Sequence, residues 1–368
     1  MRIGVPKEIK VHEYRVGLVP SAVRELTDRG HEVLVETGAG LGIGYDDAKY
    51  VKAGATIAAD AAQVFATAEM VVKVKEPQPQ ECKMLREGQV LFTYLHLAPD
   101  PVQARLLMES GCSAVAYETV LDRNGRLPLL APMSEIAGRM SIQVGAVALQ
   151  KSNGGSGVLI GGVPGVLPAK VAVLGGGVVG VNAARMALGL GGDVTILDKS
   201  LPRLADLDTA FGPGLKTAYA TADSIAEQVA EADLVVGAVL VTGAAAPKLV
   251  TRAMLSTMRA GSVLVDVSID QGGCFETSRP TTHSEPTYVV DGIVHYCVAN
   301  MPGGVARSST QALTNATLPY VLALADKKLA CALAEDAGLK AGLNVHRGAI
   351  THQAVAEALD LDYLPWAA

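Results

Sequence analysis

The chain has 368 residues, of which 49% are hydrophobic, and a formal net charge of −6 at pH 7. A chain of this length is expected to form about two domains, each with its own core. The acidic balance argues against nucleic acid as a partner. The most apolar region, residues 157–190, is interrupted by Pro164, Pro168 and Lys170, among others. That pattern is typical of buried parallel strands and argues against a membrane span.

The cysteines favour a reducing compartment. They number five, are widely spaced and include no C-x-x-C pair, so neither a disulfide framework nor a zinc site is predicted. The first residues, MRIGVP, lack the apolar core of a signal peptide and are typical of an immediate first strand. We therefore expect a cytoplasmic protein with no membrane partner.

Residues 1 to about 130 alternate short apolar strands with helices. The expected strands cover residues 3–6, 32–36, 70–74, 90–93 and 114–117. The expected helices cover residues 20–28, 46–53, 59–66 and 101–110. This alternation predicts a parallel sheet with helices on both faces. Ligands of such sheets bind at the loops beyond the carboxyl ends of the strands.

Three polar residues follow expected strands in this region, namely Arg15, Lys75 and His96. A guanidinium group binds both oxygens of a carboxylate, and an ammonium group can hold a ketone oxygen. An imidazole moves protons near neutral pH. The three would suit one small anionic substrate. Taken singly, each is more often a solvated charge or a structural histidine, and the sequence alone does not prove that they converge.

The strongest motif is a glycine-rich turn at residues 175–180. A Val-rich strand, KVAVL, precedes Gly175, Gly177 and Gly180, and a helix follows them. Glycine lets the backbone turn tightly beside a pyrophosphate, and the helix directs its N–H groups at the phosphates. Asp198 ends the next strand, where a carboxylate can bind ribose hydroxyls. It favours NAD over NADP, and we interpret the nearby Arg203 as a neighbour of the ribose or adenine.

The flanking segments complete a dinucleotide-binding fold. Ser134 is a natural N-cap for a long helix that reaches about Gln150 and joins two domains. Residues 234–240 and 262–270 are expected to be buried strands. Asp270, at the end of the second strand, either has a catalytic role, which we favour, or caps a turn. An Asp-Gly turn then closes a hairpin of residues 287–298.

The last segment is expected to be helical. Ser308 and Gln311 form a capping-box pair before a helix of residues 312–325, and helices of residues 327–337 and 351–359 follow. Because these helices do not continue the β–α pattern, we expect them to pack on the first domain. The predicted fold is α/β, with two mostly parallel, doubly wound sheets. Residues 1–130 and 307–368 form a substrate domain, and residues 131–306 form a Rossmann domain inserted in it.

Seven stretches of sequence carry a resemblance to a known family. They are MRIGVPKEIKVHEYRVGLVP, GHEVLVETGAGLGIGYDD, VVKVKEPQPQE, FTYLHLAPD, PMSEIAGRMS, GGVPGVLPAKVAVLGGGVVG and NVHRGAITHQAVAEAL. They span essentially the whole chain and are far more specific than the glycine motif. The chain resembles the family of L-alanine dehydrogenases and of the NAD-binding subunit of proton-translocating transhydrogenase.

The resemblance implies reversible oxidative deamination, in which L-alanine, NAD⁺ and water give pyruvate, ammonium and NADH. It implies substrate-binding roles for Arg15 and Lys75 and catalytic roles for His96 and Asp270. The NAD contacts that we expect from motif and resemblance are Ser134, Gly175, Gly177, Val178, Val179, Gly180, Asp198, Arg203, Val239, Leu240, Val267, Ser268, Ile269, Asp270, Arg279, Val298, Ala299, Asn300 and Met301. A homohexamer is a further expectation.

Two alternatives stay open at this point. The chain could be a transhydrogenase subunit, although its complete set of Arg15, Lys75, His96 and Asp270 argues against that. It could act on another amino acid, as in a lysine-to-saccharopine reaction.

Some family members bind magnesium through a glutamate matching Glu118 and a histidine near the end of the chain. Because that second position corresponds to Lys327 here, we predict no metal.

Overall fold

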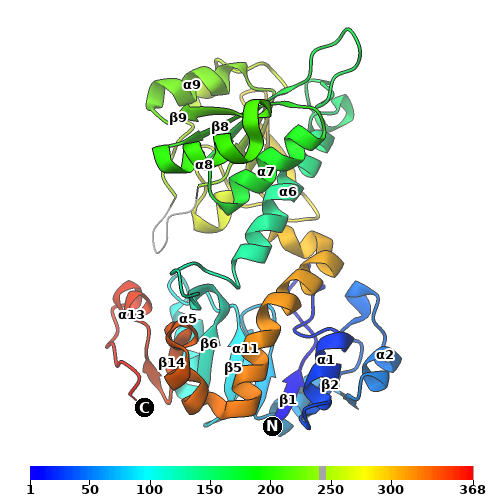
Figure 1. Cartoon of the computed structure of the whole chain (residues 1–368), viewed down its shortest axis with the longest axis vertical. Helices are drawn as coiled ribbons and strands as arrows, with labels where there is room; N and C mark the ends of the chain where they lie inside the picture. The colour runs from blue at the N-terminus through cyan, green and yellow to red at the C-terminus, as the bar shows by residue number, and fades with distance from the viewer. Residues whose placement is uncertain (240–245, 368) are drawn as a thin grey trace. The chain divides into compact units, whose positions relative to one another are not determined.

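The computed structural model describes residues 1–239 and 246–367, which form two compact α/β units (Figure 1). The first unit comprises Met1–Met133 and Gly303–Ala368, and the second comprises Ser134–Pro302. One α/β unit is thus inserted in the sequence of the other. The α/β class and this insertion confirm the expected fold.

The first unit is built on an eight-stranded sheet. In order across the sheet, the strands are β15 (Ala349–Ile350), β14 (Leu343–His346), β6 (Ser113–Ala116), β5 (Val90–Thr93), β4 (Met70–Val72), β1 (Arg2–Val5), β2 (Glu32–Glu36) and β3 (Thr56–Ala58). Neighbours from β3 to β6 pair in parallel, whereas β14 and β15 are antiparallel additions at one edge.

The order of strands in this sheet reverses between β1 and β4. From β1 the chain moves outward to β2 and β3, then returns to pair β4 with the other side of β1. Such a reversal opens a crevice at the carboxyl ends of the two central strands, where open α/β sheets bind ligands. The loop after β1 approaches this point closely, since a Cβ atom on Gly17 would lie 2.4 Å from the carbonyl oxygen of Val72.

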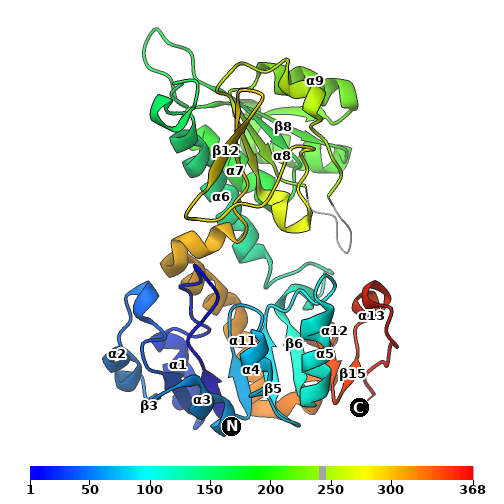
Figure 2. The ribbon, with the colours of Figure 1, turned by 180° about the vertical axis from the view of Figure 1, so that it is seen from behind.

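Helices cover both faces of the first sheet. They are α1 (Pro20–Thr27), α2 (Asp47–Lys52), α3 (Ala61–Thr67), α4 (Pro79–Cys82), α5 (Pro101–Ser110), α11 (Ala306–Glu335), α12 (Ala337–Ala341) and α13 (Gln353–Leu359). Helices α1 and α11 lie on the face seen in Figure 1, and α3, α4 and α5 lie on the reverse (Figure 2). On the reverse face, Phe65, Leu91 and Leu107 belong to one buried apolar cluster.

The second unit has a seven-stranded sheet. Its order is β12 (Thr287–Val290), β13 (Ile293–Tyr296), β11 (Val263–Asp266), β10 (Leu234–Gly237), β7 (Lys170–Leu174), β8 (Asp193–Asp198) and β9 (Lys216–Tyr219). All pairs are parallel except the β12–β13 hairpin. The helices are α6 (Ala131–Ala148), whose first three residues belong to the first unit, α7 (Val178–Gly189), α8 (Leu201–Phe211), α9 (Ala222–Glu231) and α10 (Arg252–Leu255). This is the strand order of a Rossmann fold with an antiparallel edge strand.

Two expected elements in the second unit differ in the structure. The strand predicted for residues 262–270 ends at Asp266, because the Asp266 side chain accepts a hydrogen bond from the Ser268 N–H and begins a 3-10 turn, Val267–Gln271. Ser134 is not an N-cap, because α6 begins three residues earlier at Ala131. The prediction for Leu240 falls outside the described residues.

The prediction that the last segment is wholly helical was wrong. Helix α11 begins at Ala306 without a side-chain cap, and it continues to Glu335 with a break at Lys328. Strands β14 and β15 then join the edge of the first sheet. Short apolar runs such as LNVH do not distinguish a strand from a helix until a neighbouring edge offers hydrogen bonds. Within the described residues, no helix combines the length and apolar composition needed to cross a bilayer.

We predict that Gly180→Ala destabilises the second unit, whereas Gly177→Ala does not. A Cβ atom on Gly180 would lie 1.8 Å from the Gly175 carbonyl oxygen, whereas one on Gly177 meets no atom within 4 Å. Overpacking of this kind costs about 1–3 kcal/mol. Thermal unfolding of both variants checks the difference, and equal melting temperatures would contradict it.

Candidate active site

Arg15 lies on the loop after β1 as a buried, paired cation. Its side chain is 2% exposed, and its Nε and Nη2 donate to the two oxygens of Glu13 at 2.7 and 2.5 Å. Nη1 lies 3.1 Å from Met133 Sδ. Burial opposes the charge, but the hydrogen bonds and the charge of Glu13 outweigh it and raise the pKa of Arg15. The group is thus held cationic and in one orientation, at the switch point of the sheet.

Lys75 follows β4, the strand beside β1. Its backbone is fixed on both sides. Its N–H donates to Glu8 Oε1 at 3.3 Å, and its carbonyl oxygen accepts from Thr93 Oγ1 at 3.0 Å. The ammonium group is 3.9 Å from Glu76 Oε2, and the side chain is 14% exposed. The backbone is therefore held more tightly than the side chain.

A buried ion network lies directly behind Lys75. Lys73 Nζ donates to Glu8 Oε2 at 3.1 Å and to Glu81 Oε1 at 2.7 Å. Glu8 Oε1 also accepts the Val74 N–H at 2.7 Å. Burial opposes the charge of Lys73, but the two carboxylates outweigh it and raise its pKa, and burial raises the pKa of Glu8. The network joins the loop after β1 to the end of β4 and to α4.

His96 lies on the loop after β5 in a left-handed conformation, with φ of 51°. Its N–H donates to Glu118 Oε1 at 2.6 Å, and the preceding N–H of Leu95 donates to the same carboxylate. The ring stacks on Tyr94, with centroids 5.8 Å apart and planes 4° apart, and Nδ1 is 3.9 Å from Glu118 Oε1. The side chain is 46% exposed. The imidazole is therefore open to solvent, although Glu118 holds the backbone of His96.

Tyr94 is a site residue that sequence reasoning missed. It is buried, its hydroxyl donates to the Leu129 carbonyl oxygen at 2.6 Å, and it interacts electrostatically with Arg15 and Glu118. Burial raises its pKa, which keeps the phenol neutral. It thus connects the surroundings of Arg15 with the ring of His96. The sequence offered one indication that Tyr94 belongs to the site, namely its position directly after the strand expected at residues 90–93.

The residues compared for a metal are engaged in other ways. Lys327 forms an ion pair with Glu335. Glu118 accepts the backbone N–H of His96, and its charge acts on His352. Burial lowers the pKa of His352, and its buried Nδ1 has no hydrogen-bond partner among the residues that the structure describes. Across residues 1–239 and 246–367, no group of three or more His, Cys, Asp or Glu could hold a metal ion.

The glycine turn of the second unit is held by Asp198 and Arg203. Asp198 Oδ2 accepts the Gly176 N–H at 2.7 Å, and Arg203 Nε donates to the Gly176 carbonyl oxygen at 2.6 Å. Beside Gly177 the space is open, and α7 begins there with Val178 and Val179. An open space at the N-terminus of a twelve-residue helix fits a pyrophosphate group, so these residues suit a dinucleotide.

Most other expected cofactor residues follow strands β10, β11 and β13, which are neighbours in the second sheet. Val239 follows β10, and its carbonyl oxygen accepts from Ser268 Oγ at 2.7 Å. The 3-10 turn after β11 contains Val267, Ser268, Ile269 and Asp270, and Asp270 is exposed. The segment after β13 contains Val298, Ala299, Asn300 and Met301.

Three of the expected cofactor residues, Asn300, Arg279 and Ser134, lie in different local environments. Asn300 is left-handed, with φ of 60°, and its carbonyl oxygen accepts from His283 Nε2 at 3.2 Å. Arg279 lies over the Tyr288 ring, 4.0 Å from the ring centroid. Ser134 is half-buried within α6. Strands β10, β11 and β13 are adjacent and parallel, so the segments after them lie together at the carboxyl ends of the strands. Rossmann folds bind dinucleotides at these ends.

Comparison with known proteins gives matches over nearly the whole chain. Residues 4–137 match the family model described as alanine dehydrogenase/PNT, N-terminal domain, and residues 141–353 match its C-terminal domain. An alanine dehydrogenase of Halomonas elongata is 62% identical over 364 residues, covering 99% of this chain and 98% of the relative.

Two solved structures extend the comparison. An L-alanine dehydrogenase superposes with a TM-score of 0.95 at 53% identity and covers 98% of this chain and 99% of its own. A transhydrogenase from Sinorhizobium meliloti has a TM-score of 0.81 at 27% identity and covers 96% of this chain and 100% of its own.

We predict that Lys73→Met is strongly destabilising. It leaves the carboxylates of Glu8 and Glu81 buried without their cation, and breaking a buried ion network costs about 3–5 kcal/mol. Lys170→Met is the matched control, because Lys170 pairs with Glu231 on the surface and should leave the unfolding midpoint almost unchanged. Urea unfolding measures both variants. A midpoint for Lys73→Met equal to that of the control would contradict the prediction.

Proposed function

Because the chain belongs to the alanine dehydrogenase/PNT family, we propose that it catalyses the reversible NAD-dependent oxidative deamination of L-alanine to pyruvate and ammonium. The observation that carries the proposal is the arrangement of Arg15, Lys75 and His96 after β1, β4 and β5, which are adjacent strands at the switch point of one sheet. The 62% identity to an alanine dehydrogenase supports the same activity.

Arg15 is proposed to bind the carboxylate of alanine. A guanidinium group suits this task because its planar fork matches a carboxylate, and the bond to Glu13 keeps Arg15 charged and oriented before substrate arrives. Lys75 is proposed to hydrogen-bond the oxygen that develops on the α-carbon and remains in pyruvate. Positioning of this kind supplies much of the rate of a two-substrate reaction.

His96 is proposed to carry the proton. NAD⁺, when bound, supplies the acceptor for the hydride that leaves the α-carbon, and the substrate amine becomes an iminium. His96 then accepts a proton from the water that attacks this carbon, which gives a carbinolamine. His96 returns the proton to the amine nitrogen, the C–N bond breaks as the hydroxyl becomes the carbonyl of pyruvate, and the nitrogen leaves as ammonium. Asp270 orients the attacking water or the leaving amine. Glu118 holds His96 through two backbone N–H groups and thereby fixes where the imidazole is presented.

NAD is proposed to bind the glycine turn of the second unit. The open space beside Gly177 would hold the pyrophosphate, and Asp198 would accept hydrogen bonds from the ribose hydroxyls. A carboxylate at this point would repel the 2′-phosphate of NADP. The other expected contacts, from Ser134 to Met301, belong to the same proposal, as do a homohexamer and a cytoplasmic location.

The alternative functions have weaker support. A transhydrogenase subunit is less consistent with 27% identity to a transhydrogenase against 62% to an alanine dehydrogenase. A dehydrogenase for another amino acid would use the same Arg15 clamp, so only substrate comparison separates it from the main proposal.

The first experiment follows NADH absorbance with the purified chain, NAD⁺ and L-alanine. Glycine, L-serine, L-lysine and NADP⁺ serve as comparisons. We expect turnover with L-alanine and NAD⁺ and little with NADP⁺. Tight NAD binding without turnover of any amino acid would instead indicate a subunit that depends on a partner.

We predict that His96→Ala binds NAD normally but loses turnover by about 10²–10⁴-fold, the usual contribution of a positioned acid–base group. His31→Ala is the control, because His31 pairs with Asp326 and lies at the amino end of β2, whereas His96 follows the carboxyl end of β5. Steady-state rates and NAD titration measure the two effects. Loss of NAD binding in His96→Ala, or retained turnover, would exclude the proposed role.

A further inference from the structure

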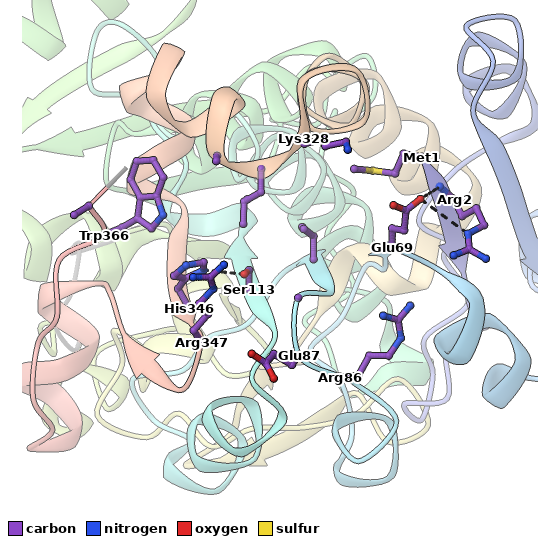
Figure 3. Close-up of a pocket in the computed structure, with 15 residues that line it drawn as sticks. Met1, Arg2, Glu69, Arg86, Glu87, Ser113, Lys328, His346, Arg347 and Trp366 are labelled. Carbon is purple, nitrogen blue, oxygen red and sulfur yellow. Dashed lines mark hydrogen bonds and ion pairs between the residues drawn. The ribbon is translucent and has the colours of Figure 1, made fainter.

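A hollow of about 670 Å³ lies at the amino ends of the strands of the first sheet (Figure 3). Arg15, Lys75 and His96 follow the carboxyl ends of their strands. Its walls come from the amino ends of β1, β4, β5 and β6, from the break in α11, from the β14–β15 turn and from Trp366. The volume is within the range of small-molecule sites. None of its lining residues belongs to the machinery described above.

The lining of this hollow is cationic in a chain whose net charge is −6. It contains four cationic side chains, Arg2, Arg86, Lys328 and Arg347, and two carboxylates. One carboxylate, that of Glu69, is already occupied, since Oε2 accepts the Arg2 N–H at 2.7 Å and lies 4.0 Å from Arg2 Nε. The other three cations therefore face a single remaining carboxylate.

The cations differ in whether they already form hydrogen bonds or ion pairs. Arg86 donates to the Ala68 carbonyl oxygen at 2.6 Å. Lys328 and Arg347 are exposed, and the described residues give neither side chain a hydrogen bond or ion pair. Exposed cations that line a concave surface without partners can bind an anion without first breaking an internal contact.

Backbone strain falls on one of these two residues, Lys328. It has φ of 61° and ψ of 164°, a region that residues other than glycine rarely adopt, and it interrupts α11. Arg347 has φ of 46° because it forms, with Gly348, the two-residue turn between β14 and β15, which requires positive φ at both positions. The break in α11 and this turn each bring a cation to the rim of the hollow.

We propose that this hollow binds a small organic or inorganic anion with two or more negative charges. Arg86, Lys328 and Arg347 would bind its phosphate or carboxylate groups, and the half-buried indole of Trp366 would flank its body. The site is separate from the proposed catalytic residues, which follow the carboxyl ends of β1, β4 and β5. It does not depend on the proposed activity.

Trp366 makes the proposal directly measurable, because it is the only tryptophan of the chain. Its fluorescence is followed while the full-length protein is titrated with inorganic pyrophosphate and, separately, with citrate, with potassium chloride holding the ionic strength constant. We expect a saturable change with at least one of these anions. Arg347→Ala should weaken that binding by about tenfold, the effect of losing one charge-assisted hydrogen bond.

Two further variants separate binding from general electrostatics and from folding. Arg105→Ala removes an exposed charge from α5, outside the hollow, and should leave the binding unchanged. Lys328→Gly should raise the melting temperature by relieving strain while it weakens binding. A fluorescence change that is equal in Arg347→Ala and Arg105→Ala, or no saturable change with either anion, would overturn the proposal. So would unchanged binding in Lys328→Gly.

Discussion

The buried network of Glu8, Lys73 and Glu81 is the constraint on which the first unit depends. One ammonium group bridges two carboxylates that come from different segments, and the same Glu8 accepts the backbone N–H groups of Val74 and Lys75. Burying three charges is favourable only where each charge has an opposite charge and hydrogen bonds within reach. The network therefore specifies how the loop after β1 meets β4. That meeting point is the switch point of the sheet. The two loops that carry the proposed substrate residues are therefore joined by buried charges, and Glu8 holds the backbone of Lys75 directly.

The two units share one sheet topology but present different chemical groups at the point where the strand order reverses. In both sheets, six parallel strands spread outward in two directions from a central reversal, and antiparallel strands extend one edge. At this point the second unit presents glycine backbone and a helix N-terminus, which suit phosphate groups. The first unit presents a guanidinium, an ammonium and an imidazole, which suit a small carboxylate substrate. The fold supplies the location, and the loops supply the specificity.

Support around the proposed site comes mostly from residues that flank the obvious candidates. Glu13 holds Arg15, Glu118 holds the backbone of His96, and Tyr94 stacks on its ring. From the sequence alone, each of these residues would be interpreted as an ordinary loop carboxylate or core aromatic residue. Glu118 lies 22 positions from His96, and spacing alone does not show that they meet. Glu13 and Tyr94 lie only two positions from the residues that they contact, but the sequence does not show the geometry of those contacts. The same reason explains why a cationic hollow at the amino ends of the strands was not predicted.

The sequence by itself determined the α/β class, the insertion of one unit in the other and the glycine turn with its closing Asp198. These features are local, because apolar runs, helix periodicity and glycine conformations are set by neighbouring residues. Tertiary structure decided the rest. Asp266 ended a strand predicted to reach Asp270, an edge of the first sheet converted residues 343–346 to a strand, and α6 began before Ser134. For residues 343–346, hydrogen bonds with a strand distant in the chain outweighed local preference. At Asp266 the bond to Ser268 is local, but the same carboxylate also accepts the N–H groups of Cys274 and Phe275, eight and nine positions away.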